Sequence, residues 1–441
     1  MQAFRRSAAQ TARAVSRQQT KRYAHHEAPA AGSIKYPEEE KLRRADSPLE
    51  NGLPFQQNIA LLHAARERLV YTQDYPVPLP KTDDELVVEI RAIGLNPVDW
   101  KSMYTCLPYS FQMQLTRSTV ITTSPSLNYL ISQAAILLGW SFAHRLLLVV
   151  CVWVICPSTD YRDIRKSAFQ EYAISTQHNV ARLPQNVPTT HGASIGVAYV
   201  AAALALGVSL GLNLPKVSGQ DDAALWEAVR KLPQDAIPID VAAECLSSIE
   251  NHERPQQGDW IAIYGGSSTS ALFISEIARL AGLKVILLAD FAKHGERLGE
   301  REGSILVDSH DPIRAINVVR AITKGKLRFA VDTVGKETAG HLVQMLQADA
   351  QEGRRAHLVG LTGVPKGKVD GIVFHSVPIK LFHEVPSIGL TLMNWLEKAL
   401  ETEAIALPEV EHAGGGLEGI NAALDRMRNG EISGRRLVIS V

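Results

Sequence analysis

The sequence predicts an α/β protein that joins a Rossmann-type, doubly wound parallel sheet to a second, β-rich domain. Three observations support this prediction. A strand, a glycine turn, a helix and a second strand follow one another between residues 255 and 290. Strands and helices then continue to alternate up to residue 402. A chain of 441 residues is also too long for one ordinary core and indicates two domains.

The central unit begins with a buried strand and a sharp turn. Residues 260–264 (WIAIY) form a short apolar run, which is typical of a strand buried on both faces. Gly265 and Gly266 interrupt this run, because only glycine tolerates the backbone angles of so sharp a turn.

A helix and a second strand complete the unit. Apolar residues recur at helical spacing over 267–280, and Ser267 or Ser268 can cap the start of this helix. The next strand covers 284–289, and Asp290 lies at its tip.

This order predicts a pyrophosphate site at the N-terminus of the helix, where unpaired backbone N–H groups favour anions. The stretch GGSSTSA is not a clean G-x-G-x-x-G, because Ser267 replaces the second glycine and Ala271 the third. The alternative interpretation is an ordinary βαβ unit without a ligand. The predicted contacts to the cofactor phosphates come from Gly265, Gly266, Ser267, Ser268, Thr269 and Ser270.

Composition excludes several classes of function. Lys plus Arg equal Asp plus Glu at 46 each, so bulk charge does not indicate a nucleic-acid partner. The four cysteines show neither C-x-x-C pairs nor zinc-ligand spacing, so we expect reduced thiols and no metal.

The first 54 residues are expected to lie outside the folded domains. Residues 1–26 contain six basic side chains and no acidic one, which is typical of a mitochondrial transit peptide. A basic tail on a cytoplasmic protein is the alternative. Residues 25–54 are charged and aperiodic and are interpreted as a disordered linker.

Beyond Asp290 the pattern predicts a parallel sheet covered on both faces. The segment 210–254, ahead of the glycine turn, is interpreted as a surface helical insertion without chemistry. Helices are predicted at 293–302, 312–323, 337–347 and 385–402, and strands at 305–307, 328–331, 357–361 and 379–382.

Several stretches together resemble the medium-chain dehydrogenase/reductase superfamily, and specifically its zinc-free quinone reductase and fungal trans-acting enoyl reductase branch. The strand LVVEIRAIG ends at Gly94 and is followed by NPVDWKS, ahead of the GGSS turn. Further similar stretches are AFQEYAISTQHNVARLPQNV (168–187), GVAYVAAALAL (196–206) and INAALDRMRNGEISGRRLVI (420–439).

The resemblance implies a domain organisation. Residues 55–191 and 404–441 would form a GroES-like catalytic domain, and residues 192–403 the dinucleotide-binding domain. It also implies a small-molecule substrate and a homodimer through the cofactor domains.

Zinc is not expected. The zinc-dependent branch of the superfamily places a cysteine directly after the glycine that ends this strand, and it carries a four-cysteine lobe. Here Leu95, Asn96 and Pro97 follow Gly94, and the lobe is missing. Without a Lewis acid, the remaining chemistry is hydride delivery to an activated double bond in an enoyl thioester, an enone or a quinone.

The resemblance places the loop from Asn96 to Lys101 near the nicotinamide. We expect Lys101 to contact the substrate carbonyl or relay a proton, Asp99 to fix the loop or ring geometry, and Asn96 to hydrogen-bond the substrate oxygen. The alternative for each is a turn residue with a surface charge. Later strand ends of the cofactor domain add Val334, Gly360 and Leu361 to the predicted cofactor contacts.

The choice between NADPH and NADH is open from the residues alone. Asp290 could accept hydrogen bonds from the ribose and repel a 2′-phosphate, which favours NADH. Lys293 and His294 supply the donors that a 2′-phosphate needs. The resembling reductases mostly use NADPH, which is therefore our prediction.

Residues 103–156 lack the glycine–acid motif and the Gly-Asp-Arg-Val turn of the resembling proteins. We interpret this segment as translated intron or a shifted reading frame, which would disrupt the catalytic domain. The stretch 134–156 is also long and apolar enough to cross a bilayer, which is the less favoured alternative. The second functional hypothesis is therefore a catalytically inactive nucleotide-binding relative, either damaged in this segment or tethered to a membrane through 134–156.

Overall fold

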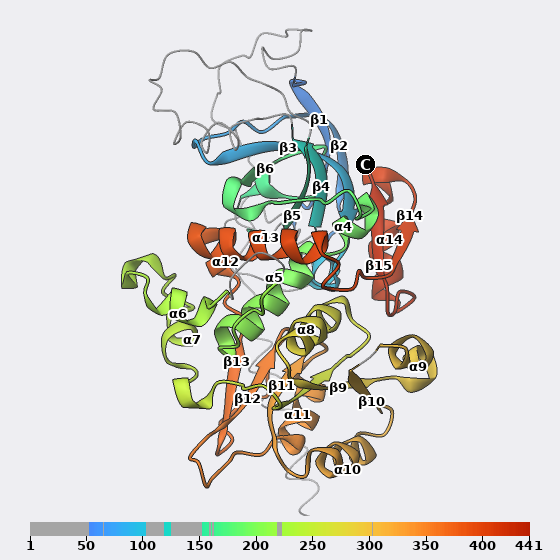
Figure 1. The fold of residues 1–441 in the computed structure, drawn as a ribbon. Coiled ribbons are helices and arrows are strands. Elements are labelled where there is room, and N and C mark those ends of the chain that lie inside the picture. Colours follow the sequence, from blue (N-terminus) through green and yellow to red (C-terminus); the bar gives the residue numbers. More distant parts are fainter. Residues whose placement is uncertain are drawn as a thin grey trace, which may run out of the picture. The chain divides into compact units, whose positions relative to one another are not determined.

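The computed structural model describes residues 53–64, 66–102, 119–124, 152–157, 160, 163–217, 223–301 and 303–441. These residues belong to one compact unit and form three sheets (Figure 1). The predicted transit peptide lies outside the described residues, and it stays a prediction, as do the predicted domain boundaries. The smallest sheet is an antiparallel pair, β1 (Gln56–Leu61) and β2 (Val70–Pro76).

A seven-stranded sheet combines residues from both ends of the chain. Its order is β14-β15-β3-β4-β5-β7, and β6 pairs with β3. The long strand β3 is buried over most of its length, and the last strand, β15, pairs with it antiparallel, with Val438 opposite Gly94. The strands are β3 (Glu85–Gly94), β4 (Thr119–Ser124), β5 (Val152–Pro157), β6 (Tyr172–Thr176), β7 (Ala181–Arg182), β14 (Val410–Ala413) and β15 (Arg436–Ser440).

The segment 103–156 lies mostly outside the described residues. Its two described stretches are β4 and the first part of β5, which pair with each other, and β4 also pairs with β3. The last residues of the apolar stretch 134–156 therefore belong to a strand. The interpretation of the segment as foreign sequence stays a prediction. Over the part of the chain that the structure describes, no helix is long and apolar enough to cross a membrane.

The six-stranded sheet confirms the predicted Rossmann-type fold. Its order is β10-β9-β8-β11-β12-β13, every pairing is parallel, and the order reverses between β8 and β11. In open parallel sheets, ligands bind at the carboxyl edge of such a reversal. The strands are β8 (Trp260–Tyr264), β9 (Lys284–Ala289), β10 (Ser304–Asp308), β11 (Leu327–Asp332), β12 (Ala356–Gly360) and β13 (Ile372–Ser376).

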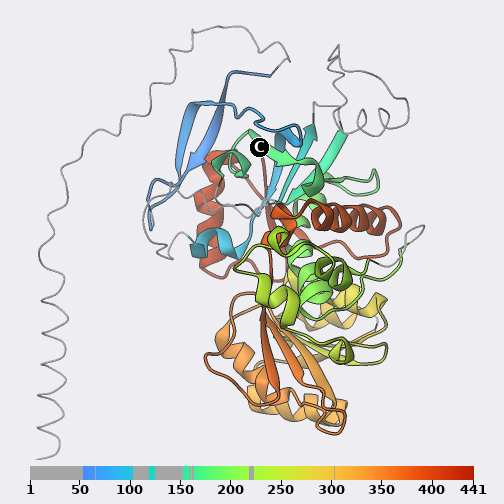
Figure 2. The ribbon, with the colours of Figure 1, turned by 90° about the vertical axis from the view of Figure 1, so that its left-hand side faces the viewer.

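Helices cover both faces of this sheet, as the alternating pattern predicts (Figure 2). One apolar core joins α8 to residues such as Ile261 and Val285, and the other joins α10 and α11 to Ala262 and Leu358. The helices are α2 (Pro97–Ser102), α4 (Thr189–Ala193), α5 (Gly196–Leu204), α6 (Leu225–Arg230), α7 (Ala242–Ser247), α8 (Thr269–Leu280), α9 (Phe291–Gly299), α10 (Pro312–Thr323), α11 (Lys336–Met345), α12 (Lys380–Glu384), α13 (Pro386–Glu401) and α14 (Ile420–Arg428).

One predicted strand is wrong. The stretch 379–382 belongs mostly to α12, and the last strand of the sheet is instead β13, Ile372–Ser376. The apolar run at 379–382 is short, and such a run does not distinguish a strand from one turn of a buried helix. Leu381 and Phe382 are indeed fully buried, but against helical neighbours of the same core.

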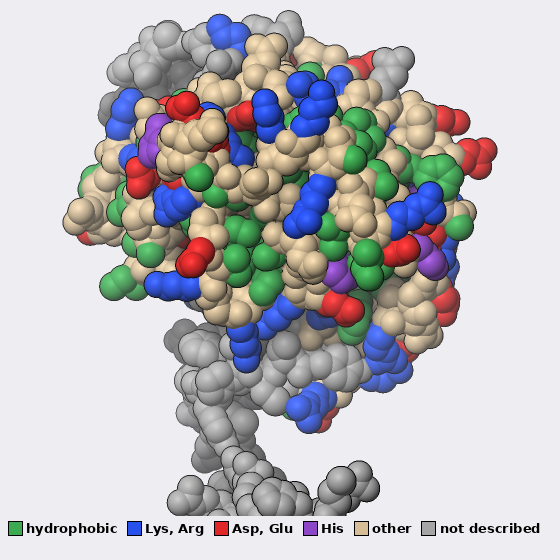
Figure 3. All heavy atoms as spheres, turned by 90° about the horizontal axis from the view of Figure 1, so that it is seen from below, with side chains coloured by type: hydrophobic (Ala, Val, Ile, Leu, Met, Phe, Trp, Pro, Cys, Tyr) green, Lys and Arg blue, Asp and Glu red, His purple; other side chains and the backbone are tan. Residues whose placement is uncertain are grey.

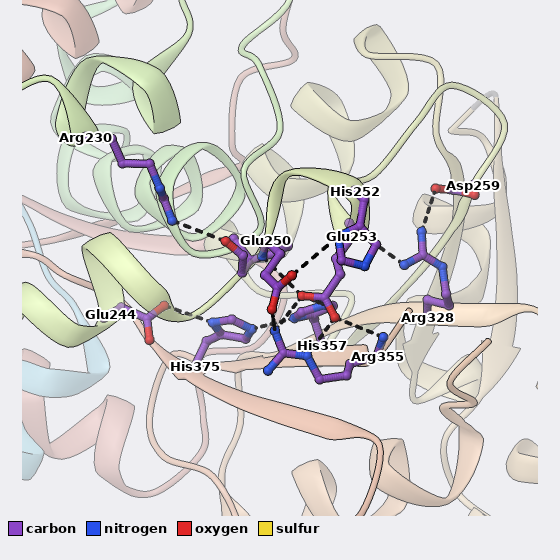
Figure 4. A network of polar contacts seen from close by, with 11 residues as sticks. Arg230, Glu244, Glu250, His252, Glu253, Asp259, Arg328, Arg355, His357 and His375 are labelled. Carbon is purple, nitrogen blue, oxygen red and sulfur yellow. Dashed lines mark hydrogen bonds and ion pairs between the residues drawn. The ribbon is translucent and has the colours of Figure 1, made fainter. Parts of the chain in front are cut away.

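The insertion 210–254 is fixed to the outer strands by buried polar residues (Figure 4). His375 Nδ1 lies 3.0 Å from Glu244 Oε1 of α7, and its Nε2 lies 3.0 Å from His357 Nδ1. Arg355 Nε donates a hydrogen bond to Glu253 Oε1 at 2.6 Å. The prediction of a surface helical excursion therefore missed these contacts, because nothing in the sequence pairs the insertion with β12 and β13.

The lower face of the molecule carries charges of both signs. In Figure 3, Lys and Arg side chains are interspersed with Asp and Glu and with apolar side chains. This mixture agrees with the balanced charge of the sequence.

The buried network predicts acid sensitivity. Burial and then the neighbouring His375 lower the pKa of His357 from its ordinary 6.5. Folded protein therefore keeps His357 neutral at pH values where the unfolded chain binds a proton. This histidine does not change the free energy of unfolding above pH 6.5. Below pH 6.5 it lowers the free energy of unfolding as the pH decreases, by at most about 1.4 kcal/mol per pH unit. Urea unfolding at pH 7, 6 and 5 measures this slope.

The matched variants are His357→Gln, whose amide can still hydrogen-bond His375, and His63→Gln at an exposed histidine. We expect His357→Gln to flatten the slope between pH 6.5 and 5, and His63→Gln to leave it unchanged. An unaltered slope in His357→Gln would contradict the assignment.

Candidate active site

The glycine turn follows β8 directly. Gly265 has φ +79°, a left-handed conformation that glycine adopts without strain. The Ser268 N–H donates to Gly265 O at 2.9 Å, and the Ser268 side chain accepts from Ala271 N at 3.1 Å as the N-cap of α8. Of the two serines predicted as the cap, the structure selects Ser268.

The tip of β11 closes against this turn. Thr333 Oγ1 donates to Tyr264 O at 3.0 Å, and it accepts a hydrogen bond from Ser268 Oγ at 3.0 Å. A Cβ on Gly265 would lie 2.3 Å from Thr333 Oγ1 and 2.6 Å from Val334 Cγ2, so only glycine fits. Residues 267–270 stay half-exposed at the first turn of α8. The turn is therefore a backbone cradle at a helix N-terminus, which fits a diphosphate.

The tip of β9 carries the predicted ribose contacts. Asp290 caps α9, with Oδ1 accepting from Lys293 N at 3.2 Å, while its Oδ2 lies 3.2 Å from Lys293 Nζ and 3.8 Å from His310 Nδ1. Although partial burial acts to raise the pKa of Asp290, its contacts with Lys293 lower it overall. Asp290, which favours NADH, and Lys293, which favours NADPH, thus form an ion pair with each other.

The tips of β11 and β12 carry the remaining predicted contacts. Val334 is 47 % exposed, and its N–H donates to Asp332 Oδ1 at 2.9 Å. Gly360 pairs with Asp332, and Leu361 N donates to Asp332 O at 2.9 Å. The structure therefore brings Gly265, Val334, Gly360 and Leu361 to the same edge of the parallel sheet.

The loop after β3 holds two of the three predicted catalytic residues together. Asn96 and Asp99 are buried, and Asn96 N donates to Asp99 Oδ2 at 2.6 Å. Asn96 Nδ2 donates to Gly94 O at 3.2 Å. Lys101 lies on the exposed side of α2, with Nζ 5.7 Å from the centre of the Trp100 ring. In the described part of the chain, no hydrogen bond joins Lys101 to the other two.

Arg436, from the first position of β15, was not predicted as a site residue. Its Nη1 donates to Leu95 O at 2.8 Å and to Asn96 Oδ1 at 2.6 Å. Only 6 % of Arg436 is exposed, and burial lowers its pKa to about 10, against the opposing effect of Asp99. The available signal was a basic residue at the start of an otherwise apolar final strand.

The residues ahead of Arg436 contact helix α9, which follows strand β9 of the parallel sheet. His294 Nε2 lies 3.0 Å from Ser433 Oγ, and Arg297 Nη2 lies 3.5 Å from Ser267 O in the glycine turn. A Cβ on Gly434 would lie 2.7 Å from Arg297 Nη2. Four consecutive residues, 433–436, thus lead from helix α9 to the Asn96 loop, a span of about 10 Å in extended chain.

Arg297 was also missed as a candidate. His294 and Arg297 lie three residues apart on α9 and therefore share a face. His294 was already named as a donor for a 2′-phosphate, and its spacing to Arg297 is the signal from which Arg297 could have been found.

A small separate cavity of about 30 Å³ opens beside β5 and β6, and its lining includes Val88, Cys156, Lys166 and His383. Val88 lies six residues before Gly94 on β3, about 20 Å along the strand. The cavity is therefore at the other end of β3 from Asn96, and it does not coincide with the candidate active site. Among the described residues, no group of three His, Cys, Asp or Glu could hold a metal ion.

Comparison with known proteins supports the family resemblance. No protein-family model matches the chain. A zinc-type alcohol dehydrogenase-like protein of Schizosaccharomyces pombe is 22 % identical over 387 residues, which cover 83 % of this chain and 95 % of the relative. The trans-enoyl reductase ACTTS2 of Alternaria alternata is 23 % identical over 378 residues, covering 83 % and 94 %. The trans-enoyl reductase milB of Cordyceps militaris is 24 % identical over 384 residues, covering 82 % and 92 %.

Solved structures share the fold. A mycobacterial protein complexed with NADPH superposes with a TM-score of 0.61 at 16 % identity, covering 87 % of this chain and 100 % of its own. The CurK enoyl reductase superposes with a TM-score of 0.58 at 13 % identity, covering 88 % and 99 %. The resemblance to medium-chain reductases that the sequence motifs indicated is therefore confirmed.

The close contact at Gly265 makes a direct prediction. Gly265→Ala places a methyl group on Thr333 Oγ1 in addition to the left-handed strain of about 1–2 kcal/mol. We expect this variant to bind NADPH at least about tenfold more weakly, since opening the turn displaces the N–H groups that hold the phosphates. Fluorescence titration with NADPH measures the affinity.

Gly258→Ala is the matched control. Gly258 also has a positive φ, of +90°, but a Cβ there meets nothing within 4 Å. This variant should lose stability to a similar backbone strain and keep the affinity for NADPH. Equal loss of affinity in both variants would show that strain, not the cradle, determines binding.

Proposed function

We propose that this chain is a zinc-independent, NADPH-dependent reductase that delivers hydride to an activated double bond in an enoyl thioester, an enone or a quinone. The observation that carries the proposal is the glycine turn, which is closed by Thr333 and open at the first turn of α8. The Asn96 loop is joined to the neighbouring helix α9 through residues 433–436. The glycine turn and the buried Asn96 loop are thus connected through α9 and residues 433–436.

The relatives support the reaction class. Several are named trans-enoyl reductases, and one structural neighbour is complexed with NADPH. Zinc independence rests on the residues themselves, because Leu95 and Asn96 stand where the zinc branch has a soft thiolate ligand.

In this proposal NADPH, when bound, supplies the hydride. The backbone of residues 265–270 would hold the diphosphate, and Asp290 with Lys293 would hold the ribose end. Asn96 donates a hydrogen bond to the substrate oxygen, and Asp99 holds the loop through the Asn96 N–H. Lys101, exposed beside Trp100, delivers or relays the proton.

The proposal extends to location and assembly. The basic, acid-poor residues 1–26 support import into mitochondria, with the cytoplasm as the alternative. The edge position of β13 in the parallel sheet offers a surface for a homodimer. The substrate is a small molecule, and nucleic acid is not a partner in this proposal.

Oxidation of NADPH with a panel of enoyl thioesters, enones and quinones tests the reaction. We expect turnover with at least one class, unaffected by EDTA or added zinc. Tight NADPH binding without turnover of any class would instead favour the second hypothesis, an inactive nucleotide-binding relative.

Cofactor preference gives a separate prediction. Asp290→Ser keeps an N-cap oxygen for α9 but removes the charge that repels a 2′-phosphate. We expect NADPH to bind several-fold more tightly and NADH more weakly, as measured by fluorescence titration. Asp235→Ser removes the same charge from an exposed turn and should change neither affinity. An unchanged ratio of the two affinities in Asp290→Ser would contradict the placement of the ribose.

A further inference from the structure

We propose that Arg436 is a positioning residue for the reduction: its buried guanidinium orients and polarises the Asn96 amide, so that the amide nitrogen faces the substrate oxygen. The proposal rests on the function proposed above and assigns to an arginine the electrostatic role that zinc has in the other branch.

The neighbours of Asn96 determine which way its amide points. Arg436 can only donate a hydrogen bond, so the atom 2.6 Å from its Nη1 must be the amide oxygen. The carbonyl of Gly94 can only accept, so the atom 3.2 Å from it must be the amide nitrogen. If the amide were flipped, its nitrogen would face the Arg436 donor and its oxygen would face the Gly94 carbonyl, so neither hydrogen bond could form. Arg436 therefore sets the direction in which Asn96 donates.

Burial of this guanidinium is expensive and calls for a reason. Its Nε is buried without a hydrogen-bond partner among the described residues. Replacing a buried ion pair by well-packed apolar side chains is often neutral for stability, so a buried charge is weak evidence of a stabilising role. The atoms that this guanidinium contacts are Leu95 O and Asn96 Oδ1, and we therefore assign its role to the Asn96 loop.

The reaction has a use for a positive charge at this point. When bound, NADPH would supply the hydride to the β-carbon of the double bond, and the π electrons would move through the α-carbon to the carbonyl oxygen. Lys101 or water would then give a proton to the α-carbon of the enolate, which would leave the saturated product and NADP⁺. Negative charge would thus develop on the oxygen that Asn96 is proposed to contact. A donor polarised by a fixed cation stabilises that charge more than it stabilises the neutral substrate.

Four variants test the proposal. Arg436→Met removes the charge, Arg436→Lys keeps it, Asn96→Ala removes the donor, and the double variant Asn96→Ala/Arg436→Met removes both. Arg328→Met is the matched control, because Arg328 is also a buried strand arginine, but it contacts Glu253 O and Asp259 at the opposite edge of the parallel sheet.

We expect Arg436→Met to lower kcat by about 10²–10³-fold. Its NADPH affinity should stay within about twofold of wild type, and its thermal midpoint should fall no further than that of Arg328→Met. Arg436→Lys should recover part of kcat. Asn96→Ala should lower kcat as much as Arg436→Met does. The double variant should lower kcat no further, because the two side chains act as one unit. Unchanged kcat in Arg436→Met, or additive losses in the double variant, would overturn the proposal.

Binding of an enolate analogue supplies a readout that does not depend on turnover. 4-Hydroxycoumarin, which is anionic at neutral pH, mimics the developing oxyanion. We expect the NADP⁺-loaded wild type to bind it at least about tenfold more tightly than Arg436→Met does. If this difference is found but no substrate is reduced, the proposed function fails, and what stands is the part of the proposal in which Arg436 orients Asn96 toward an oxyanion. Equal binding by both proteins overturns the role of Arg436, whatever the turnover.

Discussion

The contact between Gly265 and Thr333 is the constraint on which the rest of the site depends. Because Gly265 has no side chain, the tip of β11 can approach the turn, and Thr333 ties Tyr264 and Ser268 together with its hydroxyl. The first turn of α8 then points its unpaired N–H groups at the open edge of the sheet, which is the physical basis of anion binding there.

The last strand of the chain gives the site its second half. β15 belongs to the seven-stranded sheet through β3, yet the residues just before it contact α9 of the parallel sheet. Arg436 at its start contacts Leu95 and Asn96. The short segment 433–436 thus contacts both α9 and the Asn96 loop, and it places a buried charge beside that loop.

The parallel sheet could be predicted from the sequence because its signals are local. Buried strands, glycine turns and helical spacing are all readable within about fifteen residues, and 260–290 shows each of them. The strand β13 was missed because a five-residue apolar run carries no period that separates it from the nearby run at 379–382. The partners of Asn96 could not be predicted for a different reason. Arg436 lies 340 residues away, and only the pairing of β15 with β3 brings it there. The contact between Glu244 and His375 could not be predicted for the same reason, because only the fold brings the insertion next to β13.

Backbone amide hydrogen exchange with and without NADPH shows whether the glycine turn holds the diphosphate of the cofactor. If a diphosphate rests on the glycine turn, NADPH slows exchange at residues 265–272 and at 290–294, where N–H groups face the cofactor. Slower exchange should extend to 433–436, because that segment packs on α9. Protection confined to other parts of the chain, or no protection at the glycine turn under saturating NADPH, would show that the turn does not hold the diphosphate.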